Sequence, residues 1–379
     1  MAAPSPAADN ARASLYEKPL IATTGGFQIV QDQAAGSELL HHEDLEVGRP
    51  YALGCKQVTK GEIIDFGRRF DPQPMHTDEA AAKATIVGGL CASGFHTCAM
   101  MMRMVCDGLL NRVASLGSPE VDEMRWIKPV RPGDALSCRY TVQEKRVLAS
   151  RPDVGVSKVL VELTGDKGEV LASWRTNQLT RMRTPGPAPA SSAPKRDRAP
   201  LPSLWDDATP PQAVLDPDGF FEDRRIGEIT DIGRHTFGRD EIVAFAREFD
   251  PQPFHLDEAA AKVSLFGGLC ASGWHTAAIF IRSVVTSRMQ ANAQARAHGL
   301  RLPAYGPSPG FRNLRWFKPV FVGDTIEFRG RLSEKTDLVS RPERGLLASQ
   351  VQGRNQKGEI VFAITSQILA ERREPFRPA

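Results

Sequence analysis

The chain carries one long segment twice, and this internal repeat limits its possible folds more than any other feature. Residues 71–99 and 250–278 agree at 21 of 29 positions without a gap. Similarity at such a spacing indicates two copies of one structural unit. At 379 residues, each half of the chain is long enough to bury a core of its own.

Composition describes an ordinary soluble globular protein, with 41% apolar and 25% charged residues. The net charge of +3 is small and no long basic tract is present, so we expect no nucleic-acid partner. No run of about 18 apolar residues and no signal-peptide pattern occur, so we expect no membrane association. Five of the six cysteines lie in the first half of the chain and one in the second, so they do not repeat as a disulfide framework would, and they form no Cys-x-x-Cys pair. This predicts reduced, buried thiols in a cytoplasmic protein.

Proline content and the limits of the repeat together predict the domain organisation. The segment between the copies is rich in proline and poor in large apolar residues, which is typical of an extended linker. We expect an N-terminal extension, partly disordered (1–40), a first domain (41–183), a Pro-rich linker (184–218), a second domain (219–374) and a short tail (375–379).

Each copy is predicted to open with an acidic-apolar lead and a strand, to continue with helices and loops, and to end in β-structure. Residues 62–66 and 241–245 have the pattern of a short amphipathic helix, which the Asp-Pro-Gln-Pro sequence after it must end. A short Ala-rich helix should follow, and then a segment from Gly88 to about Val113 that is apolar on nearly every side and therefore buried. The alternating runs beyond it predict antiparallel strands. Each copy is thus expected to be an α+β unit whose sheet wraps round one central apolar helix.

The two copies differ in length late in the repeat. Arg-Trp-Ile-Lys-Pro-Val at 125–130 returns as Arg-Trp-Phe-Lys-Pro-Val at 315–320, which is 190 residues later rather than 179. The second copy therefore holds 11 extra residues around 291–311, in a predicted loop that could line one pocket and make the two sites unequal.

The repeated loop offers a proton-transfer pair in each copy, Asp71 with His76 and Asp250 with His255. Imidazole exchanges a proton near neutral pH, and a nearby carboxylate can orient water or share the proton transfer. Such a pair suits the hydration of a double bond next to a carbonyl, which needs two proton movements. The alternative is that Asp71 caps the next helix and His76 is an ordinary polar residue. Retention of both residues in both copies favours the catalytic interpretation.

Two glycine pairs, Gly88–Gly89 and Gly267–Gly268, are predicted to begin the buried helix. Unpaired amides at a helix N-terminus can bind an oxyanion. Alternatively, the glycines only permit a tight turn.

Other polar residues have simpler interpretations. His96 and His275 lie in the apolar segment without a companion ligand set, so we expect core histidines bonded to a backbone or hydroxyl group and no metal. Lys128 and Lys318, beside Arg125 and Arg315, could meet the phosphates of an anionic ligand or lie on a solvated edge. No nucleotide-binding glycine motif occurs.

Asp-x-x-Pro-x-His followed by Gly-Gly-Leu-x-Ala-Ser-Gly resembles the MaoC-like (R)-specific enoyl-CoA hydratases and dehydratases, in their tandem form. The resemblance covers both repeats, roughly 41–183 and 219–374, and includes the Arg-Trp-x-Lys-Pro-Val strand entry. It implies two hot dog domains that pair as a pseudo-dimer within one chain, and it leaves open a homodimer of chains. It also implies that the two Asp–His pairs activate water, with Gly89 and Gly268 as oxyanion donors.

The same resemblance suggests several substrate-binding residues. Thr97 and Thr276 fall near a small hydroxyl residue that faces the site in the family. Gln73 and Gln252 replace the usual Asn, and this longer amide could shift the pair or the substrate. We assign substrate binding to Gln73, Gln252, Thr97, Thr276, Lys128 and Lys318.

The predicted activity is reversible hydration of a trans-2-enoyl-CoA, with coenzyme A present only as part of the acyl-CoA thioester substrate and with no separate cofactor. Two alternatives remain. One is a hot dog acyl-CoA thioesterase, and the other is a non-catalytic protein that binds acyl thioesters.

Overall fold

The computed structural model describes residues 20–22, 27–30, 39–186, 202–205 and 219–377. The disorder expected in the first residues, and most of the predicted linker, lie outside these ranges. Within them, all strands join one twelve-stranded antiparallel sheet in the order β1-β2-β3-β5-β6-β7-β4-β9-β12-β11-β10-β8.

Each repeat supplies five strands of this sheet, and the segment before the first repeat adds β1 and β2 to the first half. The first half consists of β1 (Leu20–Ala22), β2 (Phe27–Val30), β3 (Pro50–Gln57), β4 (Glu120–Trp126), β5 (Ala135–Leu148), β6 (Arg151–Thr164) and β7 (Val170–Arg181). The second half consists of β8 (Ile229–Thr236), β9 (Gly310–Trp316), β10 (Thr325–Asp337), β11 (Arg344–Arg354) and β12 (Ile360–Glu371).

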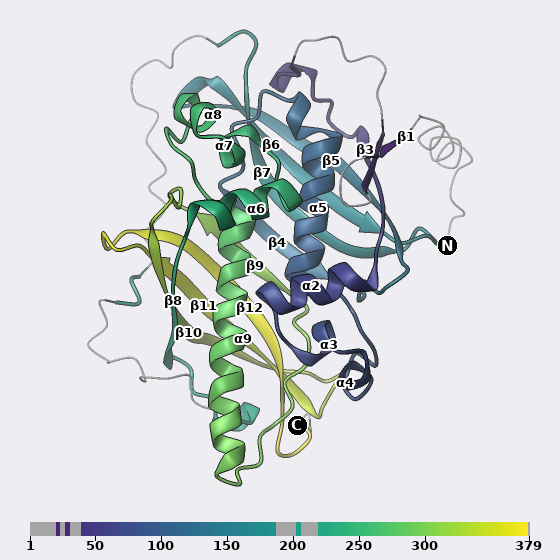
Figure 1. The fold of residues 1–379 in the computed structure, drawn as a ribbon, viewed down its shortest axis with the longest axis vertical. Coiled ribbons are helices and arrows are strands. Elements are labelled where there is room, and N and C mark those ends of the chain that lie inside the picture. The colour runs from purple at the N-terminus through teal and green to yellow at the C-terminus, as the bar shows by residue number, and fades with distance from the viewer. Residues whose placement is uncertain (1–19, 23–26, 31–38, 187–201, 206–218, 378–379) are drawn as a thin grey trace.

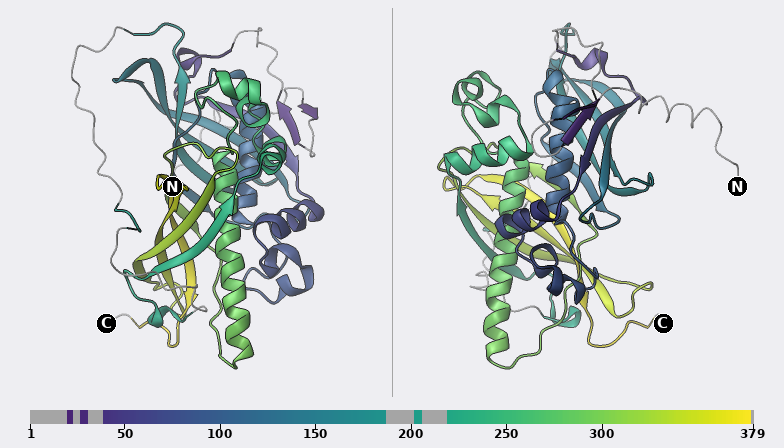
Figure 2. Two further views of the ribbon diagram at one scale, coloured as in Figure 1. Left: turned by 60° about the vertical axis from the view of Figure 1, so that its left-hand side comes forward. Right: turned by 45° about the vertical axis from the view of Figure 1, so that its right-hand side comes forward.

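The helices repeat in the same order in both units. The first unit has α2 (Lys60–Phe70), α3 (Pro74–Thr77), α4 (Glu79–Lys83) and α5 (Gly94–Gly108), and the second has α6 (Arg239–Phe249), α7 (Pro253–Leu256), α8 (Glu258–Val263) and α9 (Gly273–Ala297). Among the described residues, short 3-10 helices lie at His42–Asp44, Leu110–Arg112 and Phe221–Asp223. The long helices α5 and α9 contact each other and lie on one side of the sheet (Figures 1 and 2).

The central helix is as buried as its composition requires. Thirteen of the 15 residues of α5 are buried, because the first half of the sheet curves round it and α9 covers part of what remains. Its predicted start is wrong, however. The helix begins at Gly94, with Ser93 as its N-cap, so the glycine pair at 88–89 lies in the preceding loop.

The predicted α+β class and the pseudo-dimer are both confirmed. Strands β4 and β9 pair antiparallel at the centre of the sheet, with Met124 opposite Phe311 and Arg125 opposite Gly310. Phe311 also stacks on Phe95 of α5, with ring centroids 5.9 Å apart. The two units are therefore joined through the backbone and through a shared aromatic core.

The extra residues of the second copy lie around 291–311, as predicted, but only some of them form a loop. Helix α9 has 25 residues against 15 in α5, and an irregular segment from 298 to 309 follows it. The linker residue Leu204 is buried, and its amide donates to Gln352 on β11.

The cysteines are free, as expected, although Cys55 is only half-buried. Within the described ranges, no helix is both long and apolar enough to cross a membrane.

We expect Gly310→Ala to destabilise the protein, because Gly310 has φ of +150° and an added Cβ would overlap the Met124 carbonyl on the partner strand. Overpacking of this kind costs about 1–3 kcal/mol, which corresponds to a fall in Tm of about 1–4 °C for a chain of this size. Gly61→Ala is the matched control, since nothing lies within 4 Å of its Cβ position. Equal melting temperatures for both variants in differential scanning calorimetry would contradict this account of the β4–β9 contact.

Candidate active site

The Asp-Pro-Gln-Pro-x-His segment fixes its two ionisable residues by ending one helix and starting another. Helix α2 ends at Phe70, with Asp71 as its C-cap. A single helical turn, α3, then places His76, and its first residue is a proline, as helix starts favour. Asp71 does not cap the next helix, since Asp78 caps α4 by accepting from the Ala81 amide. The helix-capping alternative for Asp71 is therefore wrong.

The structure brings each aspartate and histidine together with nearly identical geometry. Nε2 of His76 lies 3.6 Å from Oδ2 of Asp71, and the corresponding distance between His255 and Asp250 is also 3.6 Å. In each copy the histidine Nδ1 lies 2.8 Å from a backbone carbonyl, that of Cys91 in the first. Because Nδ1–H donates to this carbonyl, Nε2 is left to face the carboxylate.

Two further side chains hold the aspartate, and sequence reasoning missed the first. Ser93 Oγ donates to Asp71 Oδ2 over 2.6 Å, and Gln73 Nε2 donates to Oδ1 over 2.9 Å. Ser93 also accepts from the Phe95 amide as the N-cap of α5. A serine before an apolar helix is a typical N-cap, and this pattern could have revealed it. The glutamine side chain is thus long enough to donate a hydrogen bond to the carboxylate two residues before it.

The second copy repeats these bonds and adds one donor from the other unit. Ser272 and Gln252 donate to Asp250 over 2.6 and 2.8 Å. Cys106 of α5 also donates its thiol hydrogen to Asp250, over 3.2 Å. The carboxylate of the second site therefore has a contact with the first unit.

The position of Asp71 between two helices explains how a carboxylate can be buried there. It lies at the C-terminal end of α2, where the helix dipole disfavours negative charge, but its Ser93 contact places it at the N-terminal end of α5, where the dipole favours it. Only 3% of Asp71 and 6% of His76 is exposed. A buried charge needs such partners.

These surroundings make His76 a strong base. Burial alone lowers its pKa, but the charge of Asp71 and the contacts with Cys91 outweigh burial and raise the pKa to about 9. At neutral pH the imidazole therefore carries a proton next to an ionised carboxylate, which is the arrangement of a general acid beside a general base.

The predicted substrate-binding residues line two cavities, one beside each Asp–His pair. Gln73, Thr97 and Lys128 line the first cavity, and Gln252, Thr276 and Lys318 line the second. The two lysines are exposed, which places them where each cavity opens to solvent. Lys318 forms an ion pair with Glu359.

Gly89 and Gly268, the predicted oxyanion donors, do not lie at a helix start. Neither is among the residues that line the two cavities beside the Asp–His pairs, whereas Gly94 and Gly273 begin α5 and α9 and line these cavities. An added Cβ at Gly94 would lie 2.5 Å from the ring of Trp126. The helix-start glycine thus has a steric reason to be glycine and brings a backbone amide to the cavity.

His96 and His275 are core residues, as expected, but their contacts differ from the prediction. Each stacks on a phenylalanine, Phe66 or Phe245, with ring centroids 4.5 and 4.7 Å apart. Their Nδ1 atoms have no hydrogen-bond partner within the described part of the chain. Burial, the largest cause, lowers the pKa of both to about 3. The described part of the chain contains no group of three or more His, Cys, Asp or Glu side chains that could hold a metal ion.

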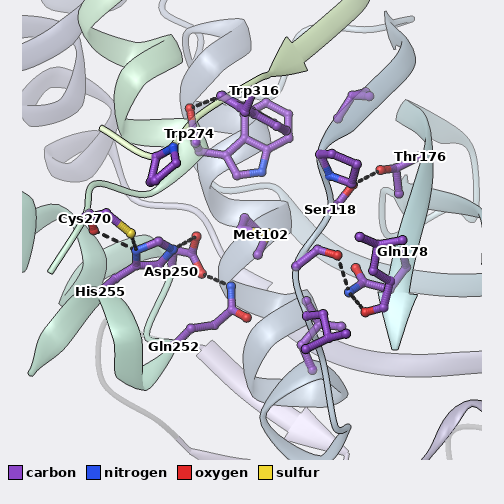
Figure 3. A pocket seen from close by; sticks show the side chains of 18 of the residues that line it. Met102, Ser118, Thr176, Gln178, Asp250, Gln252, His255, Cys270, Trp274 and Trp316 are labelled. Atoms are coloured by element: carbon purple, nitrogen blue, oxygen red, sulfur yellow. Dashed lines mark hydrogen bonds and ion pairs between the residues drawn. The ribbon is translucent and has the colours of Figure 1, made fainter. Parts of the chain in front are cut away.

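Each cavity is shared between the two units, which the sequence did not reveal. The cavity beside Asp250 is lined by Met102 of α5 and by residues of β5, β6 and β7. Figure 3 shows Asp250 and His255 on one side of this space and Thr176 and Gln178 of the first unit on the other. The cavity beside Asp71 is lined in the same way by α9 and by β10, β11 and β12.

Comparisons with known proteins agree with the repeated architecture. The MaoC like domain model matches residues 44–163 and 223–346. A 3-hydroxybutyryl-CoA dehydratase of Methylorubrum extorquens is 30% identical over 130 residues, covering 34% of this chain and 71% of that protein.

Two solved structures show the same fold over most of the chain. A putative MaoC domain dehydratase from Chloroflexus aurantiacus superposes with a TM-score of 0.71 and 17% identity, covering 90% of this chain and 100% of its own. A conserved hypothetical protein of Mycobacterium tuberculosis, described as a double hot dog fold, gives a TM-score of 0.59 and 14% identity, covering 88% and 98%. The chain is therefore a double hot dog.

We expect Asp71→Asn to lower the pKa of His76 well below about 9, because the carboxylate charge that opposes the effect of burial is removed. Histidine ¹³C NMR titration, with the signal assigned through His76→Gln, measures this change. Asp250→Asn is the control and should leave His76 titrating near 9. An unchanged His76 pKa in Asp71→Asn would show that Asp71 does not control its charge.

Proposed function

The chain belongs to the MaoC like domain family, and on that premise we propose that it reversibly hydrates trans-2-enoyl-CoA thioesters to 3-hydroxyacyl-CoA. The observation that carries the proposal is the buried Asp–His pair, present in both units with the same 3.6 Å separation and next to a cavity each time. The matched relative named as a 3-hydroxybutyryl-CoA dehydratase supports this chemistry.

In the proposed reaction the carboxylate acts as the base and the imidazolium as the acid. Asp71 takes a proton from water as the water oxygen bonds to C3 of the enoyl group. The electrons of the C2–C3 double bond move toward the thioester carbonyl, and His76 then delivers its Nε2 proton to C2. Proton transfer from the Asp71 carboxyl to His76 restores both groups. Dehydration follows the same steps in reverse.

The negative charge that develops on the thioester oxygen needs a donor. We assign this role to the backbone amide at the start of the buried helix, at Gly94 in the first site and Gly273 in the second, in place of Gly89 and Gly268. An amide at the positive end of a long helix is suited to an oxyanion, and one such donor contributes roughly 10²–10³ in rate.

Charge at the cavity mouth suits the coenzyme A portion of the substrate. Lys128 and Lys318 are exposed and line the two cavities. An ammonium group on a flexible side chain can meet a phosphate there without the cost of burying its charge.

We expect the double variant Asp71→Asn/Asp250→Asn to lose hydration of crotonyl-CoA by at least about 100-fold, the usual contribution of a general base. Loss of absorbance of the enoyl thioester measures the rate. Asp65→Asn/Asp240→Asn is the matched control, since both carboxylates are highly exposed. Full hydration by the first double variant would end the proposal. Release of free CoA thiol would indicate a thioesterase, and binding without turnover by the wild type would indicate a binding protein.

A pH profile tests the roles of the two groups. In Asp250→Asn, which leaves the first site alone active, the hydration rate should fall as pH rises through about 9, because His76 loses the proton that it gives to C2. Stopped-flow rates between pH 6 and 10.5 measure this loss. A rate that keeps rising across pH 9 would show that imidazolium is not the acid.

A further inference from the structure

The two cavities differ greatly in size although their Asp–His pairs match. The cavity beside Asp71 and His76 has a volume of about 790 Å³, and the cavity beside Asp250 and His255 has about 250 Å³. A cavity of about 150 Å³ accommodates one benzene ring. The smaller space therefore has room for a thioester with a short acyl group, whereas the larger one has room for many more methylene groups.

A row of three residues across the sheet explains much of this difference. In the first unit Tyr140, Val161 and Trp174 are register partners on adjacent strands and line the second cavity. The equivalent row in the second unit, 190 residues later, is Gly330, Val351 and Ile364, and it lines the first cavity. Two bulky aromatic residues in one row are thus replaced by glycine and isoleucine in the other.

The aromatic residues of the second site also pack against the opposite wall. Trp174 stacks on Trp274 of α9, with ring centroids 5.1 Å apart and planes 30° apart. Trp174 and Trp274 are 4% and 6% exposed, and Tyr140 is 1% exposed. The side chain that corresponds to Trp274 in the first site is the smaller Phe95. The second cavity is therefore narrowed by a packed stack of aromatic rings rather than by one mobile side chain.

The additional residues of the second copy extend the larger cavity. Arg288, on the part of α9 that has no counterpart in α5, lines it, as do Tyr305 to Gly310 of the segment that follows. The first unit, which lines the cavity beside Asp250, lacks these additional residues, so that cavity has no equivalent extension.

We propose that the two sites divide enoyl thioesters by chain length: the Asp71–His76 site accepts medium and long acyl chains, and the Asp250–His255 site accepts only short ones. The rows Gly330–Val351–Ile364 and Tyr140–Val161–Trp174 determine this specificity. The proposal rests on the proposed hydratase function, because it names the substrates of those same sites. Each methylene that only the larger cavity can bury should raise kcat/KM there by about fourfold.

Variants with a single active site test the division directly. Asp250→Asn isolates the first site and Asp71→Asn the second. Assayed with trans-2-enoyl-CoAs of 4 to 12 carbons, the first variant should show kcat/KM that increases with length, and the second should act on the 4-carbon substrate and lose at least 100-fold by 10 carbons. The same length profile in both variants would overturn the proposal.

Exchanging the rows tests the residues named. Gly330→Tyr in Asp250→Asn should remove activity on 10- and 12-carbon substrates and keep activity on crotonyl-CoA, and its added Cβ meets only ordinary 3.4 Å contacts. Gly330→Tyr in Asp71→Asn is the matched control and should leave the hydration rates of the second site unchanged, because Gly330 lines the first cavity and not the second. Trp174→Ile in Asp71→Asn should extend the second site to longer chains. Unchanged length profiles for Gly330→Tyr and Trp174→Ile would refute the assignment of these residues.

Binding separates this proposal from the hydratase function. If no variant hydrates any enoyl-CoA, the hydratase function fails, and calorimetry with saturated butanoyl- and dodecanoyl-CoA still decides the division. Dodecanoyl-CoA should then bind at one site per chain, the first cavity, with equal affinity in Asp71→Asn and Asp250→Asn. Adding Gly330→Tyr to either variant should remove this binding site. Two equivalent sites for dodecanoyl-CoA would overturn the proposal.

Discussion

The pairing of β4 with β9 is the constraint on which both candidate sites depend. Each Asp–His pair belongs to one unit, while the far wall of its cavity belongs to the sheet of the other. The register that sets Met124 opposite Phe311 therefore fixes the distance between each pair and the wall that its substrate would touch. Neither unit could form a closed cavity alone, which gives the fused pseudo-dimer a functional reason.

The buried carboxylate is the second constraint, and it explains which residues the copies share. Asp71 and Asp250 each need a serine, a glutamine and a histidine as partners, because an unpaired buried charge is costly. The carboxylate also joins the end of one helix to the start of the buried one. Substitution of any partner would disturb charge and fold together, so the motif tolerates little change while its surroundings vary.

The sequence predicted the fold and the proximity of Asp71 to His76 well, because both depend on local patterns. The repeat, the prolines after Phe70 and the unbroken apolar segment are sufficient for two helix-in-sheet units with an aspartate and histidine at one turn. Prediction from the sequence failed where a feature depends on which residues lie close together in three dimensions. The shared cavity walls required the register between strands that lie far apart in sequence. The helix start at Gly94 is different, because Ser93 as a typical N-cap could have indicated it from the sequence. His96 was expected to form a hydrogen bond, whereas burial leaves it neutral and stacked on Phe66.

Fusion of the two units allows a specialisation that a dimer of identical chains cannot have. In a symmetric dimer every substitution alters both cavities, so a residue that narrows one narrows the other. Here Tyr140 and Trp174 narrow only the cavity beside Asp250, while Gly330 and Ile364 leave the cavity beside Asp71 open. Because each row lies on the part of the sheet that faces the Asp–His pair from the other unit, its residues can change without altering the hydrogen bonds that hold the aspartate of that pair. Pocket shape and proton-transfer geometry are thereby carried by different units and can change independently.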